Sequence, residues 1–235
     1  MQVRAEHIPA DQGHGPAHPR GRRSVAERLA RLGVSVRQGP EATVTAVTAD
    51  TVQLRGGRTL PSPVTIWAAG FAAPDLAARS GLRTDASGRL LTDETLTSVD
   101  DERVVAAGDS AALPGPPVRM SCQAAVQLGP QAAETVLSRI AEERPEPVDV
   151  GFVGECISLG RRAGIFQFAR RDDTATGRHL GGRPGAKLKE LICKGTVWQL
   201  AYEGRHPGAV NGWFKDGRRR QVLAQLRGGV PASGR

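Results

Sequence analysis

The amino-acid sequence predicts a fold of the α/β class, and three features support this prediction. Residues 64–68 form a nearly all-apolar run, as expected for a strand buried on both faces. A second apolar run at 103–107 leads into Gly108-Asp109, and a long helical pattern begins at Ser121. The chain of 235 residues is long enough for one large domain or two small ones, each with a core.

The first predicted helix covers residues 24–32. Residues 1–22 are rich in Gly, Pro, His and Arg and show no periodicity, so an irregular lead-in is expected there. Ser24 and Glu27 have the spacing of a capping box, in which a hydroxyl and a carboxylate each satisfy a free amide of the first turn. An apolar stripe follows the cap, made of Val25, Leu29 and Leu32.

Short β-rich runs follow this helix and are separated by Gly, Pro and Asp turns. The pattern at 43–60 predicts a hairpin, and a short helix is expected at 74–80. A further β segment at 88–98 precedes the strand at 103–107. The β-rich runs before residue 70 are 34–36, 43–47, 51–54 and 64–68.

The helical pattern from Ser121 carries apolar residues on one side as far as Ile140. Pro130 falls inside it, and a proline removes one helical hydrogen bond and crowds the preceding turn. A kink or break is therefore expected near Gly129-Pro130. The Pro-Glu-Pro sequence at 145–147 ends the helix and marks the clearest boundary in the chain.

Beyond this boundary, alternation predicts an antiparallel pair at 152–159 and 163–169, then a polar loop at 172–185. Residues 187–202 predict a basic amphipathic helix or helix pair, and a Gly-rich tail follows. From residue 151 on, 16 Lys and Arg stand against 6 Asp and Glu. This excess of +10 suits an anionic membrane face or another polyanion, and equally a solvated surface.

Several function classes are disfavoured by composition. The three cysteines are far apart in the sequence, so no CxxC pair or zinc cluster is predicted, and His14 and His18 lie among Gly and Pro rather than on a helix. Basic residues are not interleaved with aromatic ones, which does not favour nucleic acid. No run resembles a signal peptide or approaches a membrane span, so we expect a cytoplasmic protein that is at most peripheral on the membrane face.

The residues alone allow two interpretations of the Gly108-Asp109 pair. Gly and Asp are ordinary turn residues, and Asp commonly bonds its own backbone in turns. The same arrangement, a strand entering Gly-Asp before a helix, can instead hold a polyhydroxylated ligand, because the carboxylate accepts hydrogen bonds from hydroxyl groups and the helix amides favour a negative region.

The order of segments resembles the FAD-dependent pyridine nucleotide-disulfide oxidoreductases, and most closely the type II NADH dehydrogenases. The resemblance rests on segments between residues 24 and about 140, taken in order: LARLGVSV, the hairpin, GGRTLPSPVTIWAAGF, GLRTDASGRLLTDETLTS, RVVAAGDSA and SCQAAVQLG. It implies the C-terminal portion of a flavoprotein with two Rossmann-like dinucleotide-binding domains, followed by an α+β C-terminal domain.

The resemblance also implies roles for particular residues. Gly108 and Asp109 would bind FAD, the acid through the ribitol hydroxyls, and Ala69 and Gly70 would pass near the flavin. The pattern CQAAVQ at 122–127 resembles the Ala-Gln-x-Ala-x-Gln pattern of the type II dehydrogenases, with Cys in place of the leading Ala. It implies that Gln123 and Ala124 face the cofactor and that Gln123 and Gln127, one turn apart, contact a quinone. No catalytic acid or base is implied.

Both glycine-rich dinucleotide turns of that family are missing from this sequence. An N-terminally truncated chain is therefore expected, whose missing N-terminal half would come from upstream sequence or from another chain; a homodimer is the other partner expected. The predicted function is electron transfer from NAD(P)H through FAD to a quinone-like acceptor; an inactive family fragment and a non-catalytic basic module remain as alternatives. The expected divisions are 1–23 lead-in, 24–74 remnant of the NAD(P)H-binding domain, 75–147 closing segment of the FAD-binding domain, and 148–235 basic C-terminal domain.

Overall fold

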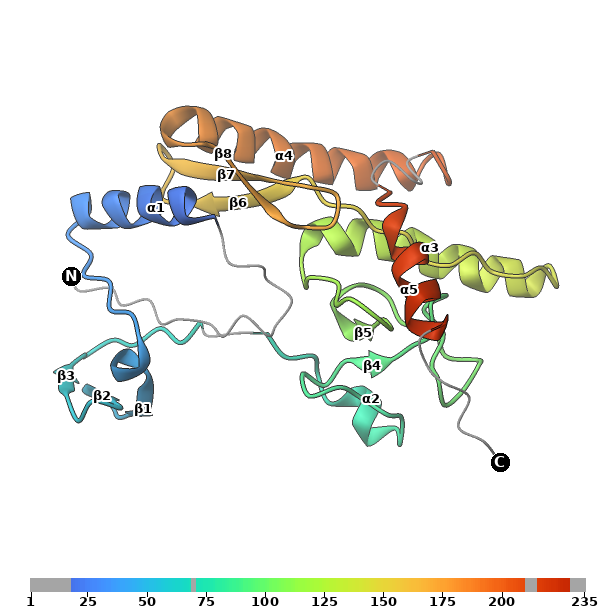
Figure 1. Cartoon of the computed structure of the whole chain (residues 1–235), viewed down its shortest axis with the longest axis horizontal. Helices are drawn as coiled ribbons and strands as arrows, with labels where there is room; N and C mark the ends of the chain where they lie inside the picture. The colour runs from blue at the N-terminus through green and yellow to red at the C-terminus, as the bar shows by residue number, and fades with distance from the viewer. Residues whose placement is uncertain (1–17, 69–70, 210–214, 229–235) are drawn as a thin grey trace.

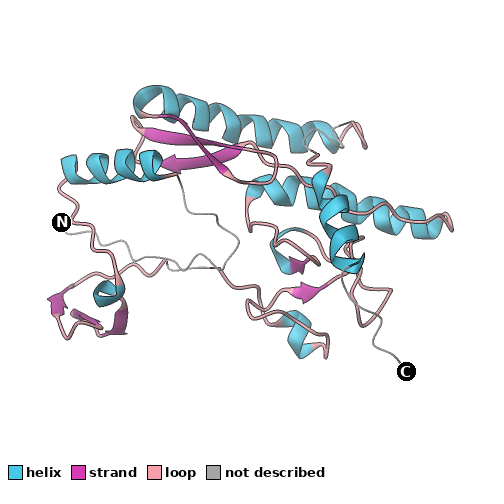
Figure 2. Ribbon diagram, in the orientation of Figure 1, coloured by secondary structure: helices cyan, strands magenta, loops and turns pink. Residues whose placement is uncertain are grey.

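The computed structural model describes residues 18–68, 71–209 and 215–228, which form helices and three small sheets. This mixture confirms the predicted α/β class. Figure 1 shows the sheet β1–β3 lying apart from the remaining elements, and Figure 2 shows the same arrangement by secondary structure.

The first sheet confirms the predicted hairpin and extends it. Strands β1 (Val44–Val47) and β2 (Thr51–Leu54) pair antiparallel, and β3 (Thr59–Pro61) adds a third antiparallel strand. Side chains of the strands themselves form a small apolar cluster, with Val52, Leu54 and Leu60 buried and Val44 packed against them.

The predicted buried strand at 64–68 is wrong, because this segment is extended but unpaired. Val64 is 78% exposed, Ile66 87% and Trp67 60%. A strand that is apolar on both faces gains stability only when neighbouring strands and covering helices bury it. None of the described residues pairs with this segment, so its apolar side chains stay in solvent.

The middle of the chain packs around one helix, α3 (Cys122–Ile140), which begins as predicted, with Ser121 as its N-cap. Strand β4 (Leu90–Leu91) lies parallel to β5 (Ala111–Ala112), and the predicted short helix is α2 (Leu76–Arg79). The strand expected at 103–107 is reduced to a single bridge between Thr97 and Val105. The main core joins these elements through Leu96, Ala111, Ala124, Leu128, Ala132, Val148, Val150 and Phe152.

Helix α3 continues through Pro130, so of the expected kink or break the break is wrong, and the kink stays a prediction. Leu128 and Ala132, on either side of the proline, are both buried in the core. Burial of this apolar face holds the helix together across the missing hydrogen bond, because packing supplies most of the stability of helices in proteins.

The C-terminal sheet contains the predicted antiparallel pair, β6 (Gly154–Ser158) and β7 (Gly164–Ala169). A third strand, β8 (Ala175–Leu180), occupies the region where a polar loop was expected. The strand lies at the edge of the sheet and its residues are all half-buried or exposed, so its sequence lacks an alternating apolar pattern. The basic amphipathic helix is one continuous helix, α4 (Gly182–Glu203).

Helix α1 (Pro19–Arg31) begins five residues before the predicted cap at Ser24. Its N-cap is His18, whose Nδ1 accepts a hydrogen bond from the backbone N–H of Arg20 at 3.3 Å. Ser24 lies inside the helix, and its hydroxyl lies 3.0 Å from Nε2 of His179 on β8. Helix α1 therefore packs against the C-terminal sheet, beside β7 and β8 (Figure 1).

The last helix, α5 (Arg218–Gly228), stands where the sequence predicted only a tail. Oδ1 of Asp149 accepts hydrogen bonds from the backbone N–H groups of Asp216 and Gly217, both at 3.0 Å. The buried guanidinium of Arg219 donates to the carbonyl oxygens of Pro114 and Pro116. These contacts attach α5 to the loop that precedes α3.

Candidate functional site

The Gly108-Asp109 pair forms a 3₁₀ turn, Gly108–Ser110, that packs against the first turns of α3. Gly108 has a φ of 64°, in the left-handed region that favours glycine. A Cβ atom at this position would lie 3.6 Å from Cβ of Ala125, which is ordinary contact. The backbone conformation, rather than lack of space, therefore requires glycine here.

Asp109 lies at the N-terminus of α3. Its Oδ1 accepts a hydrogen bond from the backbone N–H of Ser121 at 3.0 Å, while the Ser121 hydroxyl accepts one from the N–H of Ala124 at 3.3 Å. Among the described residues, none donates a hydrogen bond to Oδ2 of the exposed Asp109 side chain. This position places a carboxylate, with one oxygen still available as an acceptor, beside the positive end of a long helix.

Gln123, in the first turn of α3, has a side-chain oxygen that is buried without a hydrogen-bond partner among the described residues. A buried polar atom left without a partner costs about 1–3 kcal/mol, so a ligand that donates to it would gain that stabilisation. Gln123 is therefore the described residue of this site that most needs a further donor.

Unlike the side-chain oxygen of Gln123, the side-chain amide of Gln127 has hydrogen-bond partners within the protein. Its Nε2 donates to the carbonyl oxygen of Gly151 at 3.0 Å and to that of Gln123 at 2.7 Å, and its Oε1 accepts from the N–H of Gly151 at 3.3 Å. The amide of Gln127 thus ties α3 to the segment that leads into β6. A contact between this residue and a quinone stays a prediction.

Ala124, Ala69 and Gly70 were also predicted to lie near the cofactor, and the structure describes only Ala124 among them. Ala124 is 1% exposed, and its methyl group lies in the main core beneath the first turn of α3. Its predicted contact with a cofactor stays a prediction. Ala69 and Gly70 lie outside the described residues.

Two residues that support this site were not singled out from the sequence. Ser121 couples the Asp109 turn to the helix, and the S/T cap signal before an apolar run could have indicated it. Arg119, two residues earlier, is buried and forms an ion pair with Asp173 at 2.9 Å, and Nη2 donates to the carbonyl of Gly154 at 3.2 Å. Because these partners lie far along the chain, no local pattern pointed to them.

No described helix is both long and apolar enough to cross a bilayer. Within the same residues, no group of three or more His, Cys, Asp and Glu side chains is arranged to hold a metal ion.

Comparison with known proteins gives a match to one family model and solved structures of similar fold. Residues 15–129 match the family model described as pyridine nucleotide-disulphide oxidoreductase. No curated protein sequence matches the chain. The chain is similar in fold to the sulfide:quinone oxidoreductase of the hyperthermophilic bacterium Aquifex aeolicus, with a TM-score of 0.61 and 16% identity over 85% of this chain. It is also similar to a NAD-dependent persulfide reductase from A. fulgidus, with a TM-score of 0.52 and 18% identity over 72% of this chain.

The chain spans only part of these two proteins. It covers 49% of the sulfide:quinone oxidoreductase and 31% of the persulfide reductase. At these identities the likeness shows a shared fold.

Proposed function

Because residues 15–129 match the model of the pyridine nucleotide-disulphide oxidoreductase family, we propose that the chain supplies part of the flavin site of an FAD-dependent oxidoreductase. In this proposal, electrons pass from NAD(P)H through FAD to a quinone-like acceptor. FAD, when bound, would supply the hydride-accepting chemistry, and the protein would supply binding, orientation and electrostatics.

The observation that carries the proposal is the joint placement of Asp109 and the N-terminus of α3. Oδ2 of Asp109 is free to accept a hydrogen bond from a ligand hydroxyl, while Oδ1 is held by the N–H of Ser121. The α3 dipole favours negative charge near its first turn, and the buried oxygen of Gln123 lacks a donor. Together these groups fit a ligand that carries hydroxyls, an N–H donor and a region that becomes negative.

The test is FAD binding by the purified chain, followed by equilibrium dialysis and by flavin fluorescence. We expect saturable binding, and we expect Asp109→Asn to weaken it about tenfold, since a hydrogen bond to a charged group contributes about 1.5–3 kcal/mol. Asp75→Asn is the matched control, because Asp75 is an exposed aspartate at the N-terminus of the short helix α2. A chain that takes up no FAD, or equal losses in both variants, would contradict the proposal.

The direction of electron flow needs separate measurements. Anaerobic addition of NADH or NADPH to the FAD-loaded protein should bleach the flavin absorption, and a soluble quinone should restore it. We propose that Gln123 contacts the acceptor, so Gln123→Ala should slow reoxidation by the quinone without changing the rate of bleaching. Gln127→Ala should instead lower stability, because Gln127 ties α3 to Gly151.

We extend the proposal to peripheral membrane contact through α4. This helix exposes large apolar side chains, among them Leu191, Val197, Trp198 and Leu200, and it also carries Lys187, Lys189 and Lys194. Basic amphipathic helices bind anionic lipid surfaces by inserting such side chains, which agrees with an acceptor dissolved in the bilayer.

The test of this extension is co-sedimentation with vesicles. Binding to vesicles containing phosphatidylserine, with no binding to phosphatidylcholine alone, is expected, and Val197→Glu should abolish it. Retention of binding by the variant, or equal binding to both vesicle types, would refute the membrane role of α4.

The glycine-rich turns that grip dinucleotides in this family do not occur in the sequence. We propose that they are supplied by a further polypeptide segment or by a partner chain. An inactive chain of this family is the second candidate function, and failure of FAD binding in the dialysis experiment would favour it.

A further inference from the structure

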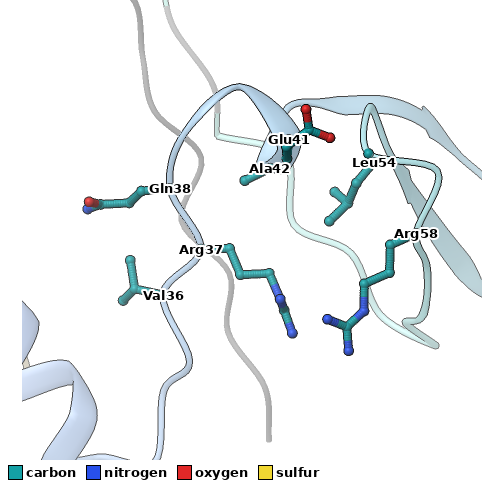
Figure 3. A pocket seen from close by; sticks show the side chains of 8 residues that line it. Val36, Arg37, Gln38, Glu41, Ala42, Leu54 and Arg58 are labelled. Atoms are coloured by element: carbon teal, nitrogen blue, oxygen red, sulfur yellow. The ribbon is translucent and has the colours of Figure 1, made fainter.

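A hollow of about 390 Å³ lies beside the sheet β1–β3, far from the Asp109 turn. Figure 3 shows it from close by, and Figure 1 shows that this sheet lies apart from α3. Its volume is within the range of about 300–1,000 Å³ found for small-molecule sites. The lining residues are Val36, Arg37, Gln38, Glu41, Ala42, Leu54, Gly56 and Arg58.

Two arginines from different segments converge on this hollow. Arg37 comes from the loop between α1 and β1, and Arg58 comes from the turn between β2 and β3. Figure 3 shows both guanidinium groups extending into the same space and toward each other. Within residues 18–68, 71–209 and 215–228, neither guanidinium forms an ion pair with a carboxylate.

The acidic residue of the lining does not neutralise them. The carboxylate of Glu41 lies directly over Gly56, where a Cβ atom would collide with its Oε2. The backbone N–H of Gly56 also donates to the Glu41 carbonyl oxygen at 3.4 Å. The absence of a side chain at Gly56 therefore lets the Glu41 carboxylate lie against the turn. The positive charges of Arg37 and Arg58 remain facing each other across the hollow.

Apart from Gln38, the rest of the lining is short or apolar. Leu54 is buried, and Val36 and Ala42 are half-buried, so these side chains present carbon atoms to the hollow. Such a surface, next to two convergent cations, suits a ligand with an anionic end and a less polar body.

We propose that this hollow binds the phosphate group of a small phosphorylated molecule. Two guanidinium forks match the tetrahedral oxygens of a phosphate, and each fork can donate two parallel hydrogen bonds. A dianion between Arg37 and Arg58 would also remove the repulsion between them. The site is independent of the flavin site, since it shares no residue with the Asp109 turn or with α3.

The test is calorimetric titration of the full chain at constant ionic strength with two probes, inorganic phosphate and AMP. Both should bind saturably, and AMP should bind more tightly because its body can contact Val36 and Leu54. Arg37→Gln and Arg58→Gln should each weaken binding of both probes about tenfold or more, as expected for loss of a charged hydrogen-bond donor. Arg58→Lys, which keeps the charge and loses the fork, should give a smaller loss.

Arg55→Gln is the matched control, because Arg55 is an exposed arginine in the same turn as Arg58 but does not line the hollow. It should change affinity less than twofold. When phosphate is added to the wild-type protein, the NMR chemical shifts of backbone amides should change at residues 36–42 and 54–58. This measurement does not depend on how the variants fold.

Three results would overturn the proposal: no saturable binding of either probe, amide shifts that map elsewhere, or equal losses in Arg55→Gln and Arg58→Gln. Binding of inorganic phosphate with no gain for AMP would show a site for the free anion and would overturn the role given to the apolar lining. None of these results bears on FAD binding, so the two proposals fail separately.

Discussion

At the scale of single residues, the chain relies on buried charges that are held by distant partners. Arg119 is 6% exposed; it forms an ion pair with Asp173 and lies 5.0 Å from the centre of the Phe152 ring. Asp173 has a left-handed φ of 65°, which Asn tolerates nearly as well as Asp. The pair therefore joins the loop before α3 to the turn between β7 and β8.

We expect Arg119→Ala to lower the free energy of unfolding by about 3 kcal/mol, because removing one partner leaves a largely buried charge uncompensated. Asp173→Asn keeps the turn conformation and should cost less, since its amide oxygen can still accept from Arg119. Urea unfolding of both variants provides the measurement. A loss below about 0.5 kcal/mol for Arg119→Ala would place this pair among the weak surface ion pairs.

A second residue-scale prediction concerns pH. Burial raises the pKa of the Asp85 carboxyl, but hydrogen bonds from the Arg89 backbone N–H and guanidinium outweigh burial and hold this pKa below its usual range. A lowered folded-state pKa stabilises the protein above the unfolded pKa of about 4, and this stabilisation is lost as pH falls through the folded value.

The difference in unfolding free energy between the wild-type chain and Asp85→Asn should therefore be constant from about pH 7 to pH 5 and shrink below about pH 4. Denaturant titrations at a series of pH values measure it. A difference that grows on acidification would mean that the Asp85 pKa is raised rather than lowered.

At the scale of elements, the sequence predicted those helices and strands whose formation depends on residues near one another in the chain. The hairpin at 43–60, the helix starting after Ser121 and the pair β6–β7 were all predicted from periodicity and turn residues. The strand at 64–68 was wrong because an apolar run says nothing about which strand will pair with it. The Gly108-Asp109 turn was predicted as a ligand site from its place in the chain, whereas the tie between Gln127 and Gly151 joins segments 24 residues apart and has no local signal.

Pro130 gives the element-scale prediction. Because α3 continues through it, Pro130→Ala should restore one backbone hydrogen bond and remove a steric conflict, at the cost of a more flexible unfolded chain. We expect a net gain of about 1–2 kcal/mol in unfolding free energy, measured by urea unfolding and by helical circular dichroism. Destabilisation would show that the proline ring itself packs in a way that the core requires.

At the scale of the whole molecule, the extended segment 64–68 joins the sheet β1–β3 to the rest of the chain (Figure 1). Trp67 and Trp198 are about equally exposed, at 60% and 61%, but Trp198 lies inside helix α4. An unpaired extended backbone fits a protease active site, whereas a helix must first unfold locally.

Limited chymotrypsin digestion should therefore cut first after Trp67, and Trp67→Ala should delay the first cut. Mass spectrometry of early fragments identifies the site. Early cleavage after Trp198 would show that α4 opens more readily than the segment at 64–68, and would weaken the proposal that α4 binds membranes as a preformed helix.

The attachment of α5 also affects how the molecule assembles. Arg219 reaches carbonyl oxygens 105 and 103 residues earlier in the sequence, just ahead of the Ser121 cap. Contacts between such distant positions form slowly, because the intervening chain must first be ordered. On the ribosome, the loop at 114–116 cannot form this contact until Arg219 has been synthesised, so the segment that leads into α3 is completed only after most of the chain has been made.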